Sequence, residues 1–151
     1  IEEPSVRMEP GRSIVADAGL TLYTANTVKI IEGYKNYVAV DGGMTDNPRF
    51  ALYGSDYTVV AASKAEENCD FNCSLVGRCC ESGDILQENV MLPSTIKRGD
   101  LIAVLTTGAY NYAMSSNYNR IQKLPVVMLN GSDDYVAVKR ETLDDIIRND
   151  V

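Results

Sequence analysis

The feature that most constrains the fold is a repeated pattern of short apolar runs broken by turn residues. The runs are rich in β-branched and aromatic residues, few of them are long, and Gly, Asn, Asp or Pro separates them. Such runs with such breaks are typical of the strands of a sheet-rich domain. We expect strands at residues 13–18 with 20–23, 28–31, 37–40, 57–62, 74–76, 101–106 and 126–129.

A hairpin is expected near the C-terminus. Asn130-Gly131-Ser132-Asp133 is a turn sequence between the run at 126–129 and the run from Tyr135 to Lys139. The second run alternates in a way that suits a half-buried strand.

One helix is expected after this hairpin. Thr142 can cap it with Asp145 three residues later, and Leu143, Ile146 and Ile147 fall on one helical face. Weaker helical or turn structure is expected at 46–53, with a proline in the first turn, and at 110–117.

The connections between the expected strands indicate how the strands pair. They are hairpins and loops with little helix, which favours antiparallel pairing because parallel pairs need long crossovers. We therefore predict an all-β fold, a mainly antiparallel β-sandwich or Greek-key barrel with one or two short helices. The 151 residues, without a repeat or a Pro/Gly/Ser-rich linker, predict one domain spanning 1–151.

Charge and hydropathy exclude two classes of partner. The formal net charge of −7 argues against nucleic acid, which requires a basic surface. The longest apolar runs, at 101–105 and 126–129, are far shorter than the roughly 20 residues needed to cross a bilayer. The acidic start Ile1-Glu2-Glu3-Pro4 has no apolar stretch of a secretory signal. We therefore expect a cytoplasmic protein with no membrane partner.

The four cysteines are Cys69, Cys73, Cys79 and Cys80. Adjacent cysteines form a disulfide only with strain, and structural zinc sites prefer well-separated pairs of ligands. The chain has no histidine, so a mixed Cys/His site is excluded and only a four-thiolate site is left as an alternative. We expect no metal and free thiols in a reducing compartment.

One short polar turn carries groups suited to proton transfer. Cys79-Cys80-Glu81-Ser82-Gly83-Asp84 lies between two runs typical of strands. A thiol can exchange a proton near neutral pH, and the adjacent carboxylate can hold an amine. Neighbouring side chains of an extended backbone point to opposite faces, so one thiol alone can enter a site. A packed cysteine and a solvated surface glutamate are the alternatives.

Three further motifs occur along the chain with this turn. They are Glu9-Pro10-Gly11-Arg12, the stretch from Asp46 to Tyr53, and Gly108-Ala109-Tyr110 followed by 114–119. In this order the four motifs resemble the C-terminal β domain of diaminopimelate decarboxylase. In that family a β domain follows an (α/β)8 barrel that carries pyridoxal 5'-phosphate, and the resemblance implies that the barrel lies outside this chain.

The resemblance implies roles for the residues of the turn. Cys80 is the expected catalytic residue, which delivers a proton to the α-carbon of the substrate. Glu81 is expected to contact the distal ammonium of the substrate, and the turn to reach across a two-fold interface into the site of a partner in a homodimer. Arg78 departs from the proline that the family more often has near this position, which leaves the rigidity of the turn open.

The other motifs supply the remaining expected site residues. Arg12, Arg49 and Tyr53 are expected to bind the distal carboxylate of the substrate, since guanidinium groups match carboxylates. Glu9, Gly11 and Arg12 resemble the stretch that closes around the cofactor phosphate. Tyr110 resembles a tyrosine that contacts both substrate and cofactor, with core packing as the alternative.

The implied reaction is the decarboxylation of meso-2,6-diaminopimelate to L-lysine and CO2, the last step of lysine biosynthesis. None of the six lysines lies in a setting that resembles the cofactor lysine of the family, so we expect this stretch alone to be inactive. A related decarboxylase of carboxynorspermidine or ornithine and a non-enzymatic β binding module are the alternatives. A cysteine hydrolase is disfavoured because no histidine can activate the thiol.

Overall fold

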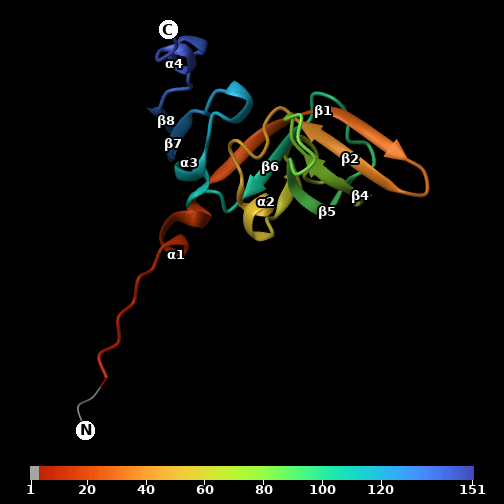
Figure 1. Cartoon of the computed structure of the whole chain (residues 1–151). Coiled ribbons are helices and arrows are strands. Elements are labelled where there is room, and N and C mark those ends of the chain that lie inside the picture. The colour runs from red at the N-terminus through yellow and green to blue at the C-terminus, as the bar shows by residue number, and fades with distance from the viewer. Residues whose placement is uncertain (1–3) are drawn as a thin grey trace.

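The structure is a computed structural model that describes residues 4–151. Strands dominate it, and the helices are short (Figure 1). The elements in chain order are α1 (Arg12–Val15), η1 (Ala16–Ala18), β1 (Leu20–Ile31), β2 (Lys35–Val40), α2 (Arg49–Tyr53), β3 (Val59–Ala61), η2 (Ala62–Lys64), β4 (Cys69–Val76), β5 (Ile85–Pro93), β6 (Leu101–Leu105), α3 (Asn111–Met114), η3 (Tyr118–Arg120), β7 (Val126–Asn130), β8 (Asp133–Val138) and α4 (Leu143–Ile147).

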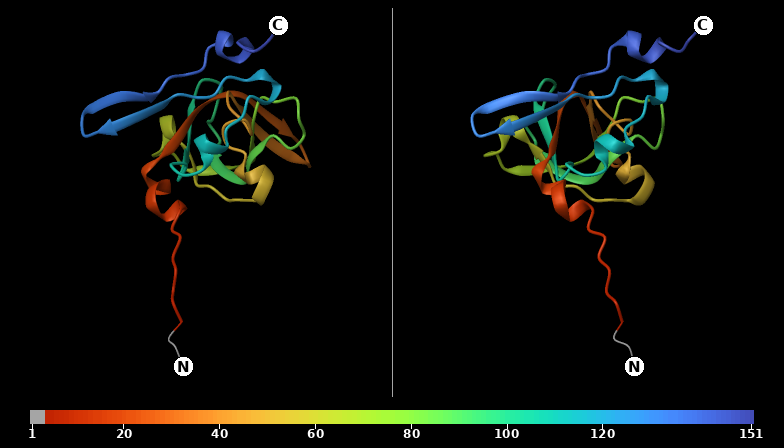
Figure 2. Two further views of the ribbon diagram at one scale, coloured as in Figure 1. Left: turned by 60° about the vertical axis from the view of Figure 1, so that its left-hand side comes forward. Right: turned by 90° about the vertical axis from the view of Figure 1, so that its left-hand side faces the viewer.

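Six strands form one strongly curved sheet. Their order is β3-β6-β1-β2-β4-β5, and all neighbours pair antiparallel except β2 and β4, which run parallel. The two edge strands, β3 and β5, contact each other, so the sheet curls into a nearly closed barrel (Figure 2). The prediction of a mainly antiparallel all-β barrel is confirmed.

The long strand β1 makes this curvature possible. Its first half pairs with β6 and its second half with β2. The register shifts between Ala25 and Thr27, and such an irregularity bends a strand and increases its twist. Ala25 is fully buried at this bend.

The interior of the barrel is apolar and closely packed. Residues from every strand of the curved sheet enter it, and the largest fully buried ones include Tyr23, Val38, Leu75, Leu86 and Ile102. Their burial is the main source of stability for the domain.

The C-terminal part lies outside this barrel. β7 and β8 form a separate two-stranded sheet, and α4 follows it at the edge of the molecule (Figure 1). Most of their apolar side chains are solvent-exposed, including Leu129 at 77%. The predicted hairpin and helix are both confirmed, and Thr142 and Asp145 form the predicted capping box.

The expected strand at 13–18 is wrong. Residues 12–18 form α1 and η1 instead, in which the carbonyl of Ala16 accepts hydrogen bonds from the backbone N–H groups of Gly19 and Gly108. Ile14 and Val15 are exposed. Apolar side chains alone therefore do not make a strand where no neighbouring strand is in reach.

The sequence predicted a strand after the polar turn but gave no bounds for it, and the structure shows that this strand is β5. Gln87, Glu88 and Asn89 interrupt its apolar pattern, and Asn89 has a positive φ of 53°. The register with β4 is irregular near this point, which explains why alternation is lost.

Among residues 4–151, no helix is long and apolar enough to cross a membrane. The same residues contain no group of three or more Cys, Asp or Glu side chains placed to hold a metal ion. Of the acidic start of the chain, Ile1 to Glu3 lie outside the described residues, so the expectation about a signal sequence is not addressed there.

Candidate functional site

Arg49 is the centre of a cluster of predicted site residues on the outside of the barrel. Its guanidinium carbon lies 5.1 Å from the ring centroid of Tyr53 and 5.4 Å from that of Tyr110. Arg49 and Tyr53 are one helical turn apart on α2, which begins after Pro48 and ends at Gly54 in the left-handed conformation. The predicted pairing of these two residues on a helix is confirmed.

Tyr110 joins this cluster to the segment around Gly11. A Cβ atom added at Gly11 would lie 1.8 Å from the Tyr110 hydroxyl oxygen, so a side chain at position 11 would require the Tyr110 ring to move. Tyr110 itself has a positive φ of 71°, an uncommon conformation for a tyrosine. Such a conformation persists only where surrounding contacts fix it.

Arg12 lies next to the same cluster. Its guanidinium carbon is 5.9 Å from the centroid of the Tyr57 ring. The Tyr57 hydroxyl donates to Oδ1 of Asn111 on α3 at 3.3 Å, and both residues are buried. We call Gly11, Arg12, Arg49, Tyr53 and Tyr110 the arginine–tyrosine cluster.

Met114, the first residue of the motif at 114–119, lies against Arg49. Nη1 of Arg49 donates to the Met114 sulfur at 3.7 Å. Among residues 4–151, nothing accepts a hydrogen bond from the buried Nε of Arg49. The cluster therefore contains two guanidinium groups, and the Nε of one of them, Arg49, is a buried donor.

The predicted thiols lie in the turn between β4 and β5. The Cys80 side chain is exposed, whereas Cys79 is half-buried. Burial and the neighbouring Asp84 carboxylate raise the pKa of the Cys79 thiol to about 11. The two thiols thus differ in exposure, and Cys80 is the more accessible one, while the prediction that a single thiol enters a site stays a prediction.

Glu81 is held by its own turn. Its Oε1 accepts from the backbone N–H of Gly83 at 3.0 Å and from the Ser82 hydroxyl at 3.2 Å. These hydrogen bonds, with that from Gly83 the largest effect, hold the pKa of the Glu81 carboxyl below its usual range. Glu81 is exposed and anionic at neutral pH, as a group that receives an ammonium must be.

Asp84 ends this turn and is buried, at 3% exposure. Its carboxylate accepts from the backbone N–H groups of Met44 at 2.6 Å and Cys79 at 2.7 Å. We call residues 77–84 the thiol loop.

The predicted site residues thus fall into two groups that are not bonded directly to each other in the described part of the chain. Among residues 4–151, no hydrogen bond or ion pair joins Cys80 or Glu81 to Arg12 or Arg49. Glu9 belongs to neither group, because it is exposed in the segment at 4–11, which runs away from the barrel (Figure 1).

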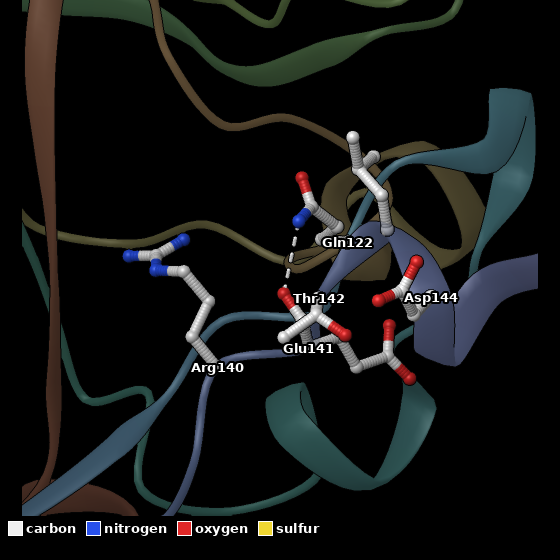
Figure 3. A pocket seen from close by; sticks show the side chains of 6 residues that line it. Gln122, Arg140, Glu141, Thr142 and Asp144 are labelled. Carbon is white, nitrogen blue, oxygen red and sulfur yellow. Dashed lines mark hydrogen bonds between the residues drawn. The ribbon is translucent and has the colours of Figure 1, made fainter.

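A hollow elsewhere on the surface contains none of the predicted site residues. It is lined by Gln122, Arg140, Glu141, Thr142, Leu143 and Asp144 (Figure 3). Nε2 of Gln122 donates to the Glu141 carbonyl across it at 3.0 Å. The hollow lies where α4 begins and is not part of either group.

A family model described as "Pyridoxal-dependent decarboxylase, C-terminal sheet domain" matches residues 13–108 of the chain. The match covers the whole curved sheet, α2 and the thiol loop. The chain belongs to this family. Gly11, Arg12 and Tyr110 of this pyridoxal-dependent decarboxylase domain lie just outside the matched range.

Known relatives extend the similarity over nearly the full chain. The diaminopimelate decarboxylase of Bacillus subtilis is 49% identical over 98% of this chain, which corresponds to 34% of that protein. A crystal structure of the M. jannaschii diaminopimelate decarboxylase with L-lysine is 30% identical, with a TM-score of 0.88 over 100% of this chain and 34% of that one. The chain therefore spans about a third of the length of these relatives.

A more distant structural neighbour matches less of the chain. The lysine/ornithine decarboxylase of Vibrio vulnificus, in complex with cadaverine, is 26% identical. Its TM-score is 0.63, and the match covers 74% of this chain and 30% of that one. The additional part matched by the diaminopimelate decarboxylase structure distinguishes the two kinds of neighbour.

The cluster contains donor groups whose chemistry suits an anionic ligand. Gly11 allows close approach of the backbone, and Arg12, Arg49 and the Tyr110 hydroxyl offer donors suited to phosphate or carboxylate. Lys35 and Lys64, by contrast, form ion pairs with Glu88 and Glu67 on the barrel. The chain thus fits the phosphate end of pyridoxal phosphate through its arginines.

Proposed function

We propose that this chain is the C-terminal domain, as one unit from 1 to 151, of a cytoplasmic diaminopimelate decarboxylase. The observation that carries the proposal is the arginine–tyrosine cluster, in which residues from three separate motifs meet around Arg49. The reaction is the release of CO2 from meso-diaminopimelate to give L-lysine. The high identity with the diaminopimelate decarboxylase of Bacillus subtilis supports this choice of substrate.

The cluster recognises the anionic ends of substrate and cofactor. The guanidinium of Arg49 lies beside the rings of Tyr53 and Tyr110, and that of Arg12 lies over the ring of Tyr57. The tyrosine rings limit the rotamers of Arg49 and keep water from one face of its guanidinium. A carboxylate can therefore be held in one orientation by paired hydrogen bonds.

The thiol loop supplies the proton. When bound, pyridoxal phosphate would supply an electron sink for the decarboxylation. Cys80, the accessible thiol of the pair, then gives its proton to the α-carbon. Glu81 binds the distal ammonium of the substrate. The ammonium replaces the Gly83 N–H and the Ser82 hydroxyl as donors to the Glu81 carboxylate.

The separation of the two groups supports a site shared between two subunits. Cys80 and Glu81 are exposed on one loop, whereas the arginines lie with α1 and α2. In a homodimer, the arginine–tyrosine cluster of one chain would meet the thiol loop of the other. An N-terminal barrel, in the two thirds of the relatives that this chain does not span, would hold the cofactor covalently. This chain alone is therefore expected to be inactive.

CO2 release by the full-length protein tests the substrate. The assay compares meso-diaminopimelate, L-ornithine and L-lysine at equal concentration, with and without added pyridoxal phosphate. We expect turnover of diaminopimelate at least a hundredfold above the other two, because only this substrate has a distal carboxylate for the arginines. Preference for ornithine or lysine would overturn the assignment.

A further inference from the structure

We propose that Asp84 is a positioning residue that makes two adjacent thiols unequal, fixing Cys79 within the thiol loop and leaving Cys80 free to act. The structural part of this proposal concerns the loop alone. Its consequence for catalysis rests on the function proposed above.

The carboxylate of Asp84 is the point at which two loops are joined. One oxygen accepts from the backbone N–H of Met44 at 2.6 Å, and the other accepts from that of Cys79 at 2.7 Å. Asp84 is 3% exposed, so water cannot readily replace these donors. Removing the carboxylate would leave two N–H groups without their partner.

Two glycines shape the space around this carboxylate. A Cβ atom added at Gly77 would lie 2.2 Å from one Asp84 oxygen, and one added at Gly43 would lie 2.7 Å from either oxygen. Both distances are far below contact, so any other residue would displace the carboxylate. The absence of side chains at Gly43 and Gly77 therefore leaves room for the Asp84 carboxylate.

Backbone hydrogen bonds fix the same end of the thiol loop. The N–H of Gly77 donates to the carbonyl of Asp84 at 2.9 Å, and the N–H of Arg78 donates to the carbonyl of Gly42 at 3.0 Å. Cys79 follows directly and is anchored by its own N–H. Cys80 is the first residue beyond these anchors, and its side chain is exposed.

Electrostatics separate the thiols further. Burial first, and then the charge of Asp84 and a hydrogen bond to it, raise the pKa of Cys79 to about 11. A thiol with that pKa is a poor nucleophile and a poor acid near neutral pH. Cys79 is therefore a much weaker proton donor near neutral pH than an ordinary thiol, which leaves Cys80 as the proposed donor.

The geometry is tested by alkylation of each thiol with iodoacetamide in the full-length protein. Cys79 is measured in a Cys80→Ser background and Cys80 in a Cys79→Ser background, and trypsin isolates each in the peptide 79–97. We expect Cys79 to react at least tenfold more slowly than Cys80 at pH 8, with a midpoint in its pH profile near 11. Asp84→Asn should accelerate Cys79 at least fivefold and lower this midpoint toward that of an ordinary thiol.

Asp70→Asn is the matched control. Asp70 also accepts two hydrogen bonds, from the backbone and hydroxyl of Ser94, away from the thiol loop. The Asp70→Asn variant should leave the alkylation rates of Cys79 and Cys80 unchanged. An Asp84→Asn protein with the same Cys79 rate and pH profile as its parent would overturn the proposal.

Cys73 reports on unfolding in the same experiment, because it is 1% exposed in the barrel interior. If Asp84→Asn makes Cys73 reactive, that variant is unfolding and Gly77→Ala is used in its place. Gly77→Ala displaces the Asp84 carboxylate, so it should raise the alkylation rate of Cys79 and leave Cys73 unreactive. Exposure of Cys73 in both variants would contradict a local positioning role.

The catalytic consequence is tested by a double-mutant cycle on kcat. Asp84→Asn should lower kcat at least tenfold with little change in KM, and should have no further effect in a Cys80→Ala background. Additive effects would show that Asp84 does not act through Cys80. If Cys80→Ala itself leaves kcat unchanged, the role of Cys80 in the proposed function fails while the alkylation result stands.

Discussion

The arginine–tyrosine cluster and the thiol loop hold their functional groups in different ways. In the cluster, the functional side chains pack against one another, with Arg49 lying 5.1 Å from the Tyr53 ring and 5.4 Å from the Tyr110 ring. In the thiol loop, the functional side chains are exposed and a buried residue, Asp84, holds the backbone beneath them.

This difference indicates what each region can do before a partner arrives. The side chains of the cluster pack against one another, so under the proposed function they can bind an anion without a partner. The thiol loop is held through its backbone and exposes Cys80 and Glu81, and under the proposed function their catalytic surroundings come from another surface. The predictions below vary the two regions separately, in order of decreasing effect.

Replacing the reactive thiol should have the largest effect. In the full-length protein we expect Cys80→Ala to lower kcat by about 10²- to 10⁴-fold, the usual contribution of a positioned acid. Cys79→Ala should lower kcat less than tenfold, because Cys79 is anchored and stays protonated. Single-turnover rates of CO2 release and of proton uptake measure both, and equal effects would contradict the assignment.

Replacing Arg49 by Lys should have the next largest effect. A lysine keeps the charge but loses the paired hydrogen bonds and the stacking between two tyrosines. We expect kcat/KM for diaminopimelate to fall about 10- to 100-fold, corresponding to about 1.5–3 kcal/mol for hydrogen bonds to a charged group. Arg120→Lys, at an exposed ion pair with Asp150, is the control and should change nothing.

Adding a methyl group at Gly11 tests the packing of the cluster. Gly11→Ala should clash with the Tyr110 hydroxyl and destabilise the cluster by about 1–3 kcal/mol. Affinity for pyridoxal phosphate, followed by absorbance, should fall with it. Tyr110→Phe removes the hydroxyl, so the double variant Gly11→Ala/Tyr110→Phe should recover part of the lost affinity. If it recovers none, the effect of Gly11→Ala does not come from a clash with Tyr110.

Replacing Glu81 by Gln should have the smallest effect. Its exposed carboxylate accepts hydrogen bonds from Ser82 and Gly83 at the surface, so the melting temperature should change little. The kcat/KM for diaminopimelate should fall about fivefold, since an amide still accepts a hydrogen bond from an ammonium but lacks the charge. A large loss of thermal stability would show that Glu81 serves the fold.

Local patterns in the sequence predicted much of the fold. Turn residues at 130–133 and the cap at Thr142 act over a few residues, so both elements were found. Long-range pairing was not accessible in this way. The parallel pairing of β2 with β4 and the helical start at Arg12–Val15 depend on which backbone groups meet in the folded barrel.

The site was partly predictable for the same reason. Arg49 and Tyr53 were paired correctly because they are neighbours on a helix. The contact between Gly11 and Tyr110 joins residues far apart in the chain, and periodicity carries no signal for it. The role of Asp84 was missed because its partners, Met44 and Cys79, are backbone donors that no side-chain pattern marks.

The most direct test of the central claim mixes two full-length variants, Arg49→Ala and Cys80→Ala, each nearly inactive alone. If the cluster of one chain works with the thiol loop of its partner, each hybrid dimer contains one site with both residues intact. After subunit exchange at equal amounts, about a quarter of wild-type activity should return. If activity stays at the level of the single variants although mass spectrometry detects hybrid dimers, the shared site is contradicted.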